Sequence, residues 1–338
     1  MSVPRPHLLH KFSHIIWDVD GTITEGDTLH SGVLRNIAEL AENGVFHSFV
    51  TGRDAAWLIE HLIADLAQLN RDVLMRMNFF AEIGSVNIEI GADGSYKTSI
   101  NPLLAEHPLV QNRGGIRDRL RALVYDPALL HVGGYDKNND IVIYDANGIA
   151  YLIARVTTPP PFPDYIWSSY KEAMATFENI RLSYGEAAYI ADHSSCVETI
   201  EQIIKDDGLE NSIAVESVAT AINIVPAVNG IRYGKAWGAG QAIDALARAQ
   251  KISSRALVNK TIAFGDSISD LDLGTPLLDG GMRVGRLPVV FVGNPSTLLG
   301  LYEEQLSRIA ILNTMTTMSG PRTTERALRY LRRRGYLP

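Results

Sequence analysis

Two carboxylates, Asp18 and Asp20, stand directly after a short apolar run, in the motif DVDGT. In an extended chain, residues two apart point to the same side, which places these carboxylates roughly 6 to 7 Å from each other. One carboxylate can then attack a phosphorus atom in line, while the other protonates the leaving oxygen and later deprotonates a water molecule. Gly21 allows the chain to turn sharply after the pair. The motif therefore indicates phosphoryl chemistry with a carboxylate nucleophile.

A second acidic group follows another apolar run, at Asp266 and Asp270 in the motif GDSISD. Asp266 stands at the end of the apolar run and Asp270 lies one helical turn later, which keeps both carboxylates near one place. Neighbouring carboxylates repel one another, so we expect a divalent cation to hold them ionised and to neutralise an incoming phosphate. Oxygen-rich ligand sets favour Mg²⁺.

Two further motifs offer groups that bind phosphate. Thr51, Gly52 and Arg53 follow an apolar run and provide a hydroxyl donor at the end of an expected strand. Lys235 follows Gly234 at the start of an expected helix, where its ammonium group can bridge a nucleophilic carboxylate and a phosphate oxygen. The chain therefore holds four motifs that suit phosphoryl transfer, in the order DVDGT, VTGR, GK and GDSISD.

The elements around these motifs alternate between apolar strands and helices. Such a βαβα order predicts a doubly wound, Rossmann-like α/β core built on a parallel sheet. Ligand sites in these sheets form at the carboxyl ends of the strands, where the motifs stand. The expected strands are residues 14–17, 45–50, 261–264 and 289–292, and the expected helices are residues 31–43, 55–69, 235–249 and the region near 271–278.

The middle of the chain has a different pattern, with short strand-like runs separated by turn residues. We expect residues 86–215 to form an inserted α+β domain with a largely antiparallel sheet, and residues 1–85 with 216–338 to form the core. The strand-like runs are residues 81–90, 129–135, 140–144, 149–156, 180–184 and 187–191, and the expected helices are residues 164–178 and 196–205.

Together, the four motifs resemble those of the haloacid dehalogenase-like phosphatases, and the resemblance extends over both core segments, which make up well over half of the chain. It implies that Asp18 is the nucleophile and that Asp20 is the general acid and base. The same resemblance implies that Thr51, Gly52 and Lys235 bind the phosphate.

The resemblance also implies a metal site, in which Mg²⁺ is held by Asp18, the backbone carbonyl of Asp20, and Asp266. Asp270 would support these ligands without contacting the ion itself. The insert lies between the second and third motifs, and this position is similar to that of the branch with a large α/β cap. That branch includes phosphatases of sugar phosphates, so a sugar phosphate or a related small phosphorylated metabolite is the implied substrate.

Three positions near the motifs extend or depart from this resemblance. Arg53 and Asn294 are candidates for contact with the substrate. Ser269 stands where the branch commonly has asparagine, and the resemblance therefore does not extend to a direct phosphate contact at this position.

Other interpretations of the motifs stay open. An isolated DVDGT could be a turn that caps a strand, although four motifs in order at strand ends and helix starts disfavour this. A phosphomutase or phosphotransferase would use the same motifs and pass the phosphoryl group to a second sugar hydroxyl. A non-catalytic sugar-phosphate-binding regulatory protein is a further alternative. The charged side chains of Asp18, Asp20, Lys235 and Asp266 argue against it, because such a protein has no physical need to hold four costly charges together. A dehalogenase is disfavoured, because a carbon–halogen substrate needs neither Mg²⁺ nor the acid at Asp20.

Bulk composition narrows the class of protein further. A chain of 338 residues exceeds the usual size of a single core, which fits one core plus one insertion. The net charge of −7 disfavours a nucleic-acid partner, and the arginines of residues 326–334 suit the solvated face of a helix. Cys196 is the single cysteine, so an internal disulfide is excluded. No apolar run approaches the roughly 18 residues of a membrane span.

We therefore expect a cytoplasmic protein that acts on a small molecule, without nucleic-acid or membrane partners. The N-terminal residues 1–12 contain no apolar run long enough for a signal peptide. The sequence leaves the oligomeric state and the identity of the substrate open.

Overall fold

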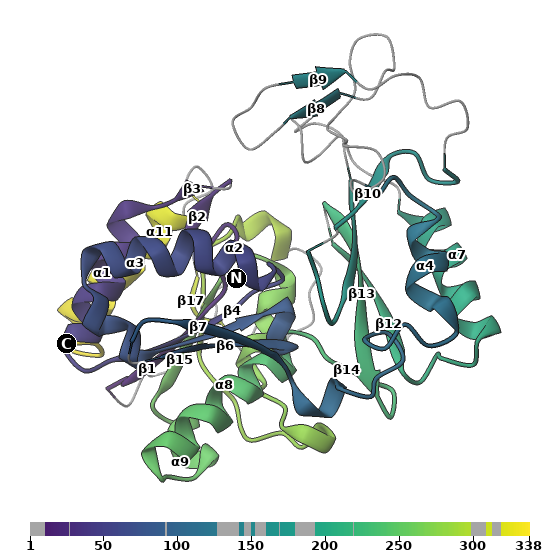
Figure 1. Ribbon diagram of the computed structural model, residues 1–338. Helices are drawn as coiled ribbons and strands as arrows, with labels where there is room; N and C mark the ends of the chain where they lie inside the picture. The colour runs from purple at the N-terminus through teal and green to yellow at the C-terminus, as the bar shows by residue number, and fades with distance from the viewer. Residues whose placement is uncertain are drawn as a thin grey trace. The chain divides into compact units, whose positions relative to one another are not determined.

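The computed structural model describes residues 11–26, 28–91, 93–126, 142–144, 150–152, 160–168, 170–179, 193–218, 220–298, 309–312 and 319–338. The chain divides into two compact units (Figure 1). One unit comprises Met1–Asn101 and Tyr233–Pro338, and the other comprises Pro102–Arg232. The motifs that suit phosphoryl chemistry all belong to the first unit.

An eight-stranded sheet forms the centre of the first unit, in the order β17-β16-β15-β1-β4-β5-β6-β7. The six strands from β17 to β5 are parallel, whereas β6 and β7 continue the sheet antiparallel. The strands are β1 (His14–Trp17), β4 (Phe46–Val50), β5 (Met77–Ala81), β6 (Val86–Ile90), β7 (Tyr96–Ile100), β15 (Thr261–Gly265), β16 (Val289–Phe291) and β17 (Ile309–Leu312), with a separate short hairpin of β2 (Thr24–Glu25) and β3 (Thr28–Leu29).

Helices cover both faces of this sheet, which confirms the doubly wound α/β core (Figure 1). On one side α1 packs against α3 and α11, and on the other side α8 packs against α9. The helices are α1 (Ser31–Glu42), α2 (Ala55–Trp57), the π-helix η1 (Leu58–Ile63), α3 (Ala64–Leu69), α8 (Lys235–Gln250), α9 (Ser254–Val258) and α11 (Pro321–Arg333), with 3₁₀ helices η2 (Arg71–Arg76), η3 (Glu82–Gly84), η6 (Ile268–Gly274), η7 (Asp279–Gly281) and η8 (Pro295–Leu298).

The core boundaries lie later in the chain than the sequence predicts. Strands β6 and β7 pair with β5 in the first unit, so the expected start of the insert at residue 86 is too early. At the other end, β12 (Ile213–Val218) and β13 (Ala221–Val228) belong to the sheet of the second unit, which extends to Arg232. The early start arose because antiparallel strands were expected in the insert alone, and the early end arose because the residues that lead up to Lys235 were assigned to the core.

The second unit contains an antiparallel sheet in the order β10-β11-β13-β12, with β14 paired to β13. Apolar side chains of this sheet form one core with those of α4 and α7. The remaining elements are β10 (Tyr165–Trp167), β11 (Ala175–Asn179), β14 (Ile231–Arg232), the β8 (Val142–Tyr144) and β9 (Ala150–Leu152) pair, α4 (Ile116–Arg121), α7 (Ser194–Asp206), and 3₁₀ helices η4 (Pro102–Leu104) and η5 (Arg113–Gly115).

The helix expected at residues 164–178 is wrong, because this region forms the antiparallel pair β10 and β11. Tyr165 and Trp167 alternate into the core and so do Ala175 and Phe177, which is a period of two and not a helical period. The helix expected at 196–205 is confirmed as α7. The strands expected at 129–135, 180–184 and 187–191 lie outside the described residues.

The C-terminal helix α11 has the amphipathic character that its arginines indicate. Ala327, Leu328 and Leu331 are buried, whereas Arg329 and Arg333 are exposed.

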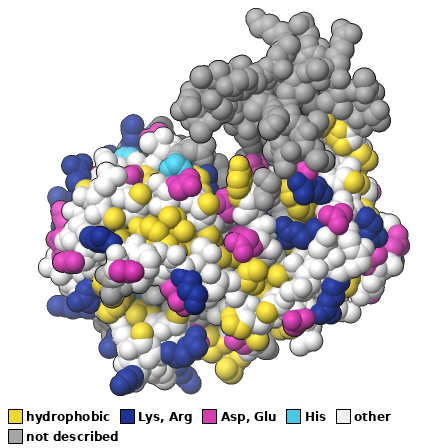
Figure 2. All heavy atoms as spheres, in the orientation of Figure 1, with side chains coloured by type: hydrophobic (Ala, Val, Ile, Leu, Met, Phe, Trp, Pro, Cys, Tyr) yellow, Lys and Arg dark blue, Asp and Glu magenta, His cyan; other side chains and the backbone are white. Residues whose placement is uncertain are grey.

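On the face shown in Figure 2, basic side chains of the described residues are interspersed with acidic ones. Among the described residues, no helix combines the length and the apolar composition that crossing a bilayer requires.

Two histidines lie at the centre of the sheet, and both are fully buried. The ring of His14 contacts the hydroxyls of Thr261 (3.1 Å) and Ser48 (2.9 Å), and Trp17 Nε1 donates to His47 Nδ1 at 2.9 Å. Burial lowers the pKa of each histidine to about 3, and for His47 the neighbouring His14 adds to the effect. Both side chains are therefore neutral in the folded protein.

Acid should consequently destabilise the first unit. The folded pKa values lie below the ordinary value of 6.5, so the stability that neutral His14 and His47 provide is present above pH 6.5 and is lost as the pH falls towards 3. Each histidine should lower the free energy of unfolding by about 1.4 kcal/mol per pH unit below 6.5. Urea unfolding at several pH values measures this slope. It should be shallower in His47→Phe and unchanged in His61→Asn, and a pH-independent stability would contradict the expectation.

Candidate active site

Three neighbouring strands bring the acidic and phosphate-binding motifs to one edge of the sheet. In the register of β1, Trp17 lies beside Phe264 of β15 and Phe49 of β4. Asp18 follows β1 directly, and its backbone N–H donates to the carbonyl of Phe264 at 3.0 Å. Because the three strands are parallel, the residues that follow them, Asp18, Thr51 and Asp266, stand at the same edge. The predicted placement of these motifs at strand ends is confirmed.

Asp18 is buried and has a partner for each carboxylate oxygen. The hydroxyl of Thr22 donates to Oδ2 at 3.2 Å, and the ammonium group of Lys235 contacts Oδ1. Burial raises the pKa of Asp18 well above its usual range, the charge of Asp270 raises it further, and Lys235 acts in the opposite direction. The site therefore needs positive charge to keep Asp18 ionised.

Lys235 supplies part of that charge from the first residue of α8. Its Nζ contacts Asp18, the carbonyl of Val50 (3.1 Å) and Asp270 Oδ1 (3.1 Å). Burial alone would lower the pKa of Lys235, but the Asp18 and Asp270 carboxylates outweigh burial, and its pKa is raised. Lys235 is therefore a fixed cation beside the proposed nucleophile.

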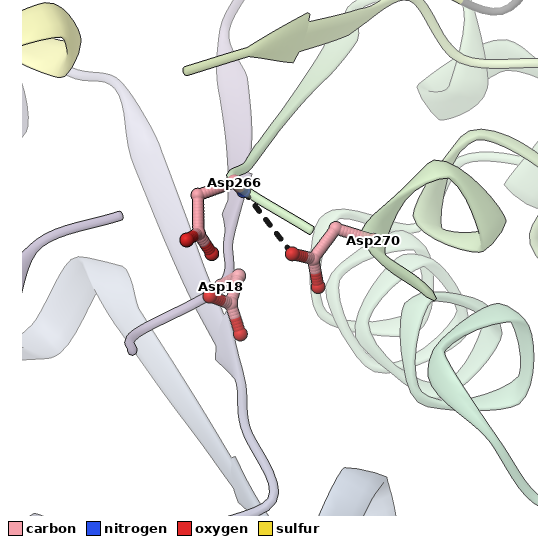
Figure 3. Close-up of side chains that lie close together, drawn as sticks. All are labelled: Asp18, Asp266 and Asp270. Carbon is pink, nitrogen blue, oxygen red and sulfur yellow. Dashed lines mark hydrogen bonds between the residues drawn. The ribbon is translucent and has the colours of Figure 1, made fainter. Parts of the chain in front are cut away.

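Three carboxylates, those of Asp18, Asp266 and Asp270, lie close together, as Figure 3 shows. One oxygen each from Asp18, Asp266 and Asp270 lies within 4.8 Å of the others. Burial, followed by the charge of Asp270, raises the pKa of Asp266 to about 7. The raised pKa values of Asp18 and Asp266, together with hard oxygen donors, have the chemistry of a site for a divalent cation.

Asp270 serves a different purpose from the other two carboxylates. Its Oδ2 accepts from Asp266 N (3.1 Å), Ser267 N (2.9 Å) and Ser267 Oγ (2.7 Å). Its Oδ1 faces Lys235. Since Oδ2 is already saturated with donors and Oδ1 pairs with an ammonium group, Asp18 and Asp266 are better placed to hold a cation.

Glycine is required at Gly21, where the first motif passes the acidic cluster. The residue has a φ of 69°, and an added Cβ would lie 2.1 Å from Asp266 Oδ2. Gly293 is equally constrained, because an added Cβ would lie 1.7 Å from the carbonyl oxygen of Asp266. Asp266 is therefore enclosed by backbone from two loops.

Asp20 differs from Asp18 because its side chain is 48% exposed. The guanidinium of Arg53 holds it through one oxygen, with Nε at 2.8 Å and Nη2 at 2.7 Å from Oδ1. The same guanidinium lies 4.3 Å from the centre of the Trp57 ring. Arg53, which the sequence offers as a substrate contact, is thus paired with the expected general acid and base.

The second motif forms a tight loop after β4. Thr51 is fully buried, its N–H donates to the carbonyl of Phe80 at 3.2 Å, and its hydroxyl accepts from Arg53 N at 3.2 Å. Gly52 has a different setting, because no described atom lies within 4 Å of the position that a Cβ would take. The position beside Gly52 is therefore open.

Gly52→Ala tests whether phosphate occupies this space. The added methyl group meets no described protein atom, so the melting temperature should stay unchanged. If phosphate binds against the Gly52 backbone, the methyl group should raise KM by about tenfold, equivalent to about 1.4 kcal/mol. Steady-state kinetics and thermal unfolding measure both quantities. An unchanged KM would place the phosphate elsewhere.

A turn that the sequence analysis missed holds this loop. Glu82, Ile83 and Gly84 have successive φ values of 49°, 59° and 91°. Outside glycine such values cost on the order of 1–3 kcal/mol each and persist only where the surroundings impose them. Here Glu82 N donates to the carbonyl of Arg53 (2.9 Å), and Ile83 N donates to that of Thr51 (2.7 Å).

The other side of the same turn packs against α8. An added Cβ on Gly84 would lie 2.9 Å from Gly238 Cα, and one on Gly238 would lie 2.8 Å from the carbonyl oxygen of Ile83. The turn therefore connects the loop of residues 51–53 with the helix that carries Lys235. In the sequence, Gly84 could have indicated this turn, but residues 81–90 were interpreted as one strand.

The two remaining candidates have partners in their own loops. Ser269 Oγ lies 2.9 Å from Ser267 Oγ, within the turn that Asp270 organises. Asn294 is exposed, and its Oδ1 accepts from Ser296 N (3.0 Å) and Ser296 Oγ (2.8 Å) at the start of η8. These contacts account for both side chains in the turns, and a contact of Asn294 with substrate stays a prediction.

Solved structures similar to this chain have low sequence identity to it. A haloacid dehalogenase-like hydrolase from Bacteroides thetaiotaomicron is 14% identical with a TM-score of 0.48, over 95% of this chain and 100% of that one. A protein from Thermoplasma acidophilum is 11% identical with a TM-score of 0.49, over 96% and 99% of the two chains. An IMP-bound IMP-nucleotidase from Plasmodium falciparum is 10% identical with a TM-score of 0.46, over 96% and 68%.

No family model matches the sequence, and no curated protein matches it. At identities of 10–14% and TM-scores of 0.46–0.49, the structural similarities carry no conclusion about chemistry. The class of the protein has to be inferred from the arrangement of its own residues.

Proposed function

We propose that this protein is a Mg²⁺-dependent phosphomonoester hydrolase of the haloacid dehalogenase-like class, working through an aspartyl phosphate on Asp18. The observation that carries the proposal is the contact of Lys235 with Asp18 beside the carboxylate of Asp266. A buried carboxylate between a fixed ammonium group and a second carboxylate is an arrangement that costs stability, which favours a catalytic purpose.

In the first step, an oxygen of Asp18 attacks the phosphorus atom of the substrate and the bond to the leaving oxygen breaks. Asp20 donates its proton to the departing alkoxide. The half-exposed position of Asp20 supports this role, because the leaving group and the water have to reach it. Lys235 can neutralise the phosphoryl oxygens as charge develops on them.

In the second step, Asp20 takes a proton from a water molecule whose oxygen attacks the phosphorus of the aspartyl phosphate. The acyl phosphate bond breaks, inorganic phosphate leaves, and Asp18 and the protonated Asp20 are restored. Arg53 holds Asp20 by a single oxygen, which leaves the other oxygen available for proton transfer.

We propose that Asp18, Asp266 and the backbone carbonyl of Asp20 hold the Mg²⁺ ion. The raised pKa values of Asp18 and Asp266, caused first by burial, support a cation at this place. When bound, the ion would neutralise the carboxylates and the phosphate so that an anion can approach an anionic nucleophile.

The second unit is proposed as the part that selects the substrate, which we infer to be a sugar phosphate or a related small phosphorylated metabolite. Support comes from its place in the chain, since Pro102–Arg232 is inserted between Arg53 and Lys235. A domain inserted between two phosphate-binding motifs can change the preferred leaving group without altering the chemistry.

Release of inorganic phosphate from a panel of sugar phosphates, phosphorylated acids and nucleoside monophosphates tests the proposal. We expect release that requires Mg²⁺, that stops when EDTA is added, and that is stoichiometric with the dephosphorylated product. Transfer of phosphate to a second hydroxyl without release would identify a phosphomutase. Binding of a sugar phosphate without turnover, by protein that holds Mg²⁺, would identify a regulatory protein.

A further inference from the structure

Helix α11 is connected to the nucleophile through two threonine hydroxyls. Thr324 and Thr22 are both fully buried. The hydroxyl of Thr324 donates to the carbonyl oxygen of Thr22 at 2.7 Å, and the hydroxyl of Thr22 donates to Asp18 Oδ2 at 3.2 Å. Thr324 thus holds the backbone of Thr22, and the side chain of Thr22 orients Asp18.

The choice of acceptor by Thr324 is not the usual one for a helical threonine. Within a helix, a threonine hydroxyl commonly donates to the carbonyl four residues earlier. Here that carbonyl belongs to Gly320 and lies 3.5 Å away, at the limit of a hydrogen bond, whereas the Thr22 carbonyl lies at 2.7 Å. The single proton of this hydroxyl therefore goes to the loop of the first motif.

A second contact joins the start of α11 to the same loop. Gly320 has a φ of 71°, and an added Cβ would lie 3.0 Å from the carbonyl oxygen of Gly21. The N–H of Gly320 donates to the carbonyl of Val292 at 2.9 Å. The apolar face of α11 is buried, so the helix offers this loop a rigid support.

We propose that Thr324 is a positioning residue for the nucleophile, acting through Thr22. With Thr22 fixed, its hydroxyl keeps Asp18 Oδ2 in one orientation while Lys235 holds Oδ1. Releasing the Thr22 carbonyl would let the loop move and widen the range of orientations of Asp18. A displaced nucleophile slows the attack on phosphorus more than it weakens substrate binding, because the effect lies in the approach to the transition state. This inference rests on the proposed function.

Three variants separate positioning from general stability. Thr324→Val removes the hydroxyl and preserves the shape, and Thr324→Ser restores the hydroxyl. Thr261→Val is the control for lost stability, since Thr261 is also fully buried and its hydroxyl donates to the carbonyl of Leu257 at 2.8 Å and contacts the ring of His14 at 3.1 Å. Thr261 begins β15, at the end of the strand opposite the acidic cluster.

We expect Thr324→Val to lower kcat by about tenfold, the equivalent of one hydrogen bond, with KM changed less than twofold. Thr324→Ser should recover kcat to within twofold of the wild type. Thr261→Val should lower the melting temperature at least as much as Thr324→Val while leaving kcat unchanged. Gly320→Ala, which presses on the Gly21 carbonyl, should lower kcat in the same direction as Thr324→Val.

Binding of beryllofluoride, which mimics a phosphoryl group on aspartate, provides a readout that needs no substrate. Fluorine NMR should show weaker binding by Thr324→Val than by Thr261→Val. A wild type that neither releases phosphate nor binds beryllofluoride would overturn the proposed function and this inference with it. A wild type that does both, with kcat and beryllofluoride affinity in Thr324→Val equal to those of Thr261→Val, would overturn the inference alone.

Discussion

Asp18→Asn should lower kcat for phosphate release by about four orders of magnitude or more, because the amide cannot form an acyl phosphate. The substitution keeps the shape of the side chain and an oxygen that can accept from Thr22. We therefore expect the variant to fold and to bind substrate with a KM or Kd near that of the wild type. Single-turnover phosphate release measures the loss.

Acid quenching of the reaction provides a direct test of the intermediate. The wild type should retain labelled phosphate on the protein, in a bond that hydroxylamine cleaves, and Asp18→Asn should retain none. Asp20→Asn is the matched comparison, since its loss of activity should be smaller for substrates with good leaving groups that need no proton. Residual activity above about one per cent in Asp18→Asn would argue for direct attack by water instead.

Lys235→Met should produce the second large effect, on both activity and stability. The ammonium group contacts Asp18 and Asp270, and methionine fills similar volume without charge. Loss of one donor to the phosphoryl group should lower kcat/KM by about 10²–10³. The unpaired carboxylates should also lower the free energy of unfolding by about 3–5 kcal/mol, since removing one partner of a buried ion pair leaves its charge uncompensated.

Mg²⁺ distinguishes the two effects of Lys235→Met. A cation bound by the carboxylates would restore part of the lost stability, so the melting temperature of the variant should rise more with Mg²⁺ than that of the wild type. The activity should not recover, because the phosphate has still lost its lysine. Lys260→Met, at an exposed lysine just before β15, should change neither quantity. If Lys235→Met in EDTA had the same free energy of unfolding as the wild type, the electrostatic explanation would be contradicted.

Much of the core could be predicted from the sequence because its signals are local. Apolar runs that end abruptly in polar motifs gave the positions of β1, β4 and β15, and the parallel order then placed Asp18, Thr51 and Asp266 at one edge. Helix α8 was equally clear, since Lys235 follows a glycine and begins a long regular pattern. These features depend on spacing along the chain alone.

The contacts that organise the site depend on three-dimensional proximity and carry no such signal. The pairing of Arg53 with Asp20 joins residues 33 apart, and the contact of Thr324 with Thr22 joins residues 302 apart. The turn at Ile83 requires a backbone conformation that its residue type disfavours, so propensity predicts against it. The helix expected at 164–178 failed because apolar spacing over short runs fits a strand as well as a helix.

The arrangement of strands in the first unit also bears on how the protein is made. Strand β1 is completely buried between β4 and β15, and Lys235 is 217 residues away from Asp18 in sequence. On the ribosome, β1 and β4 can pair early, whereas β15 arrives only after all of Pro102–Arg232 has been synthesised. The second unit is continuous and can complete its own core in that interval. Until then, the edge of β1 that pairs with β15 has no partner, and unpaired strand edges in a nascent chain favour aggregation.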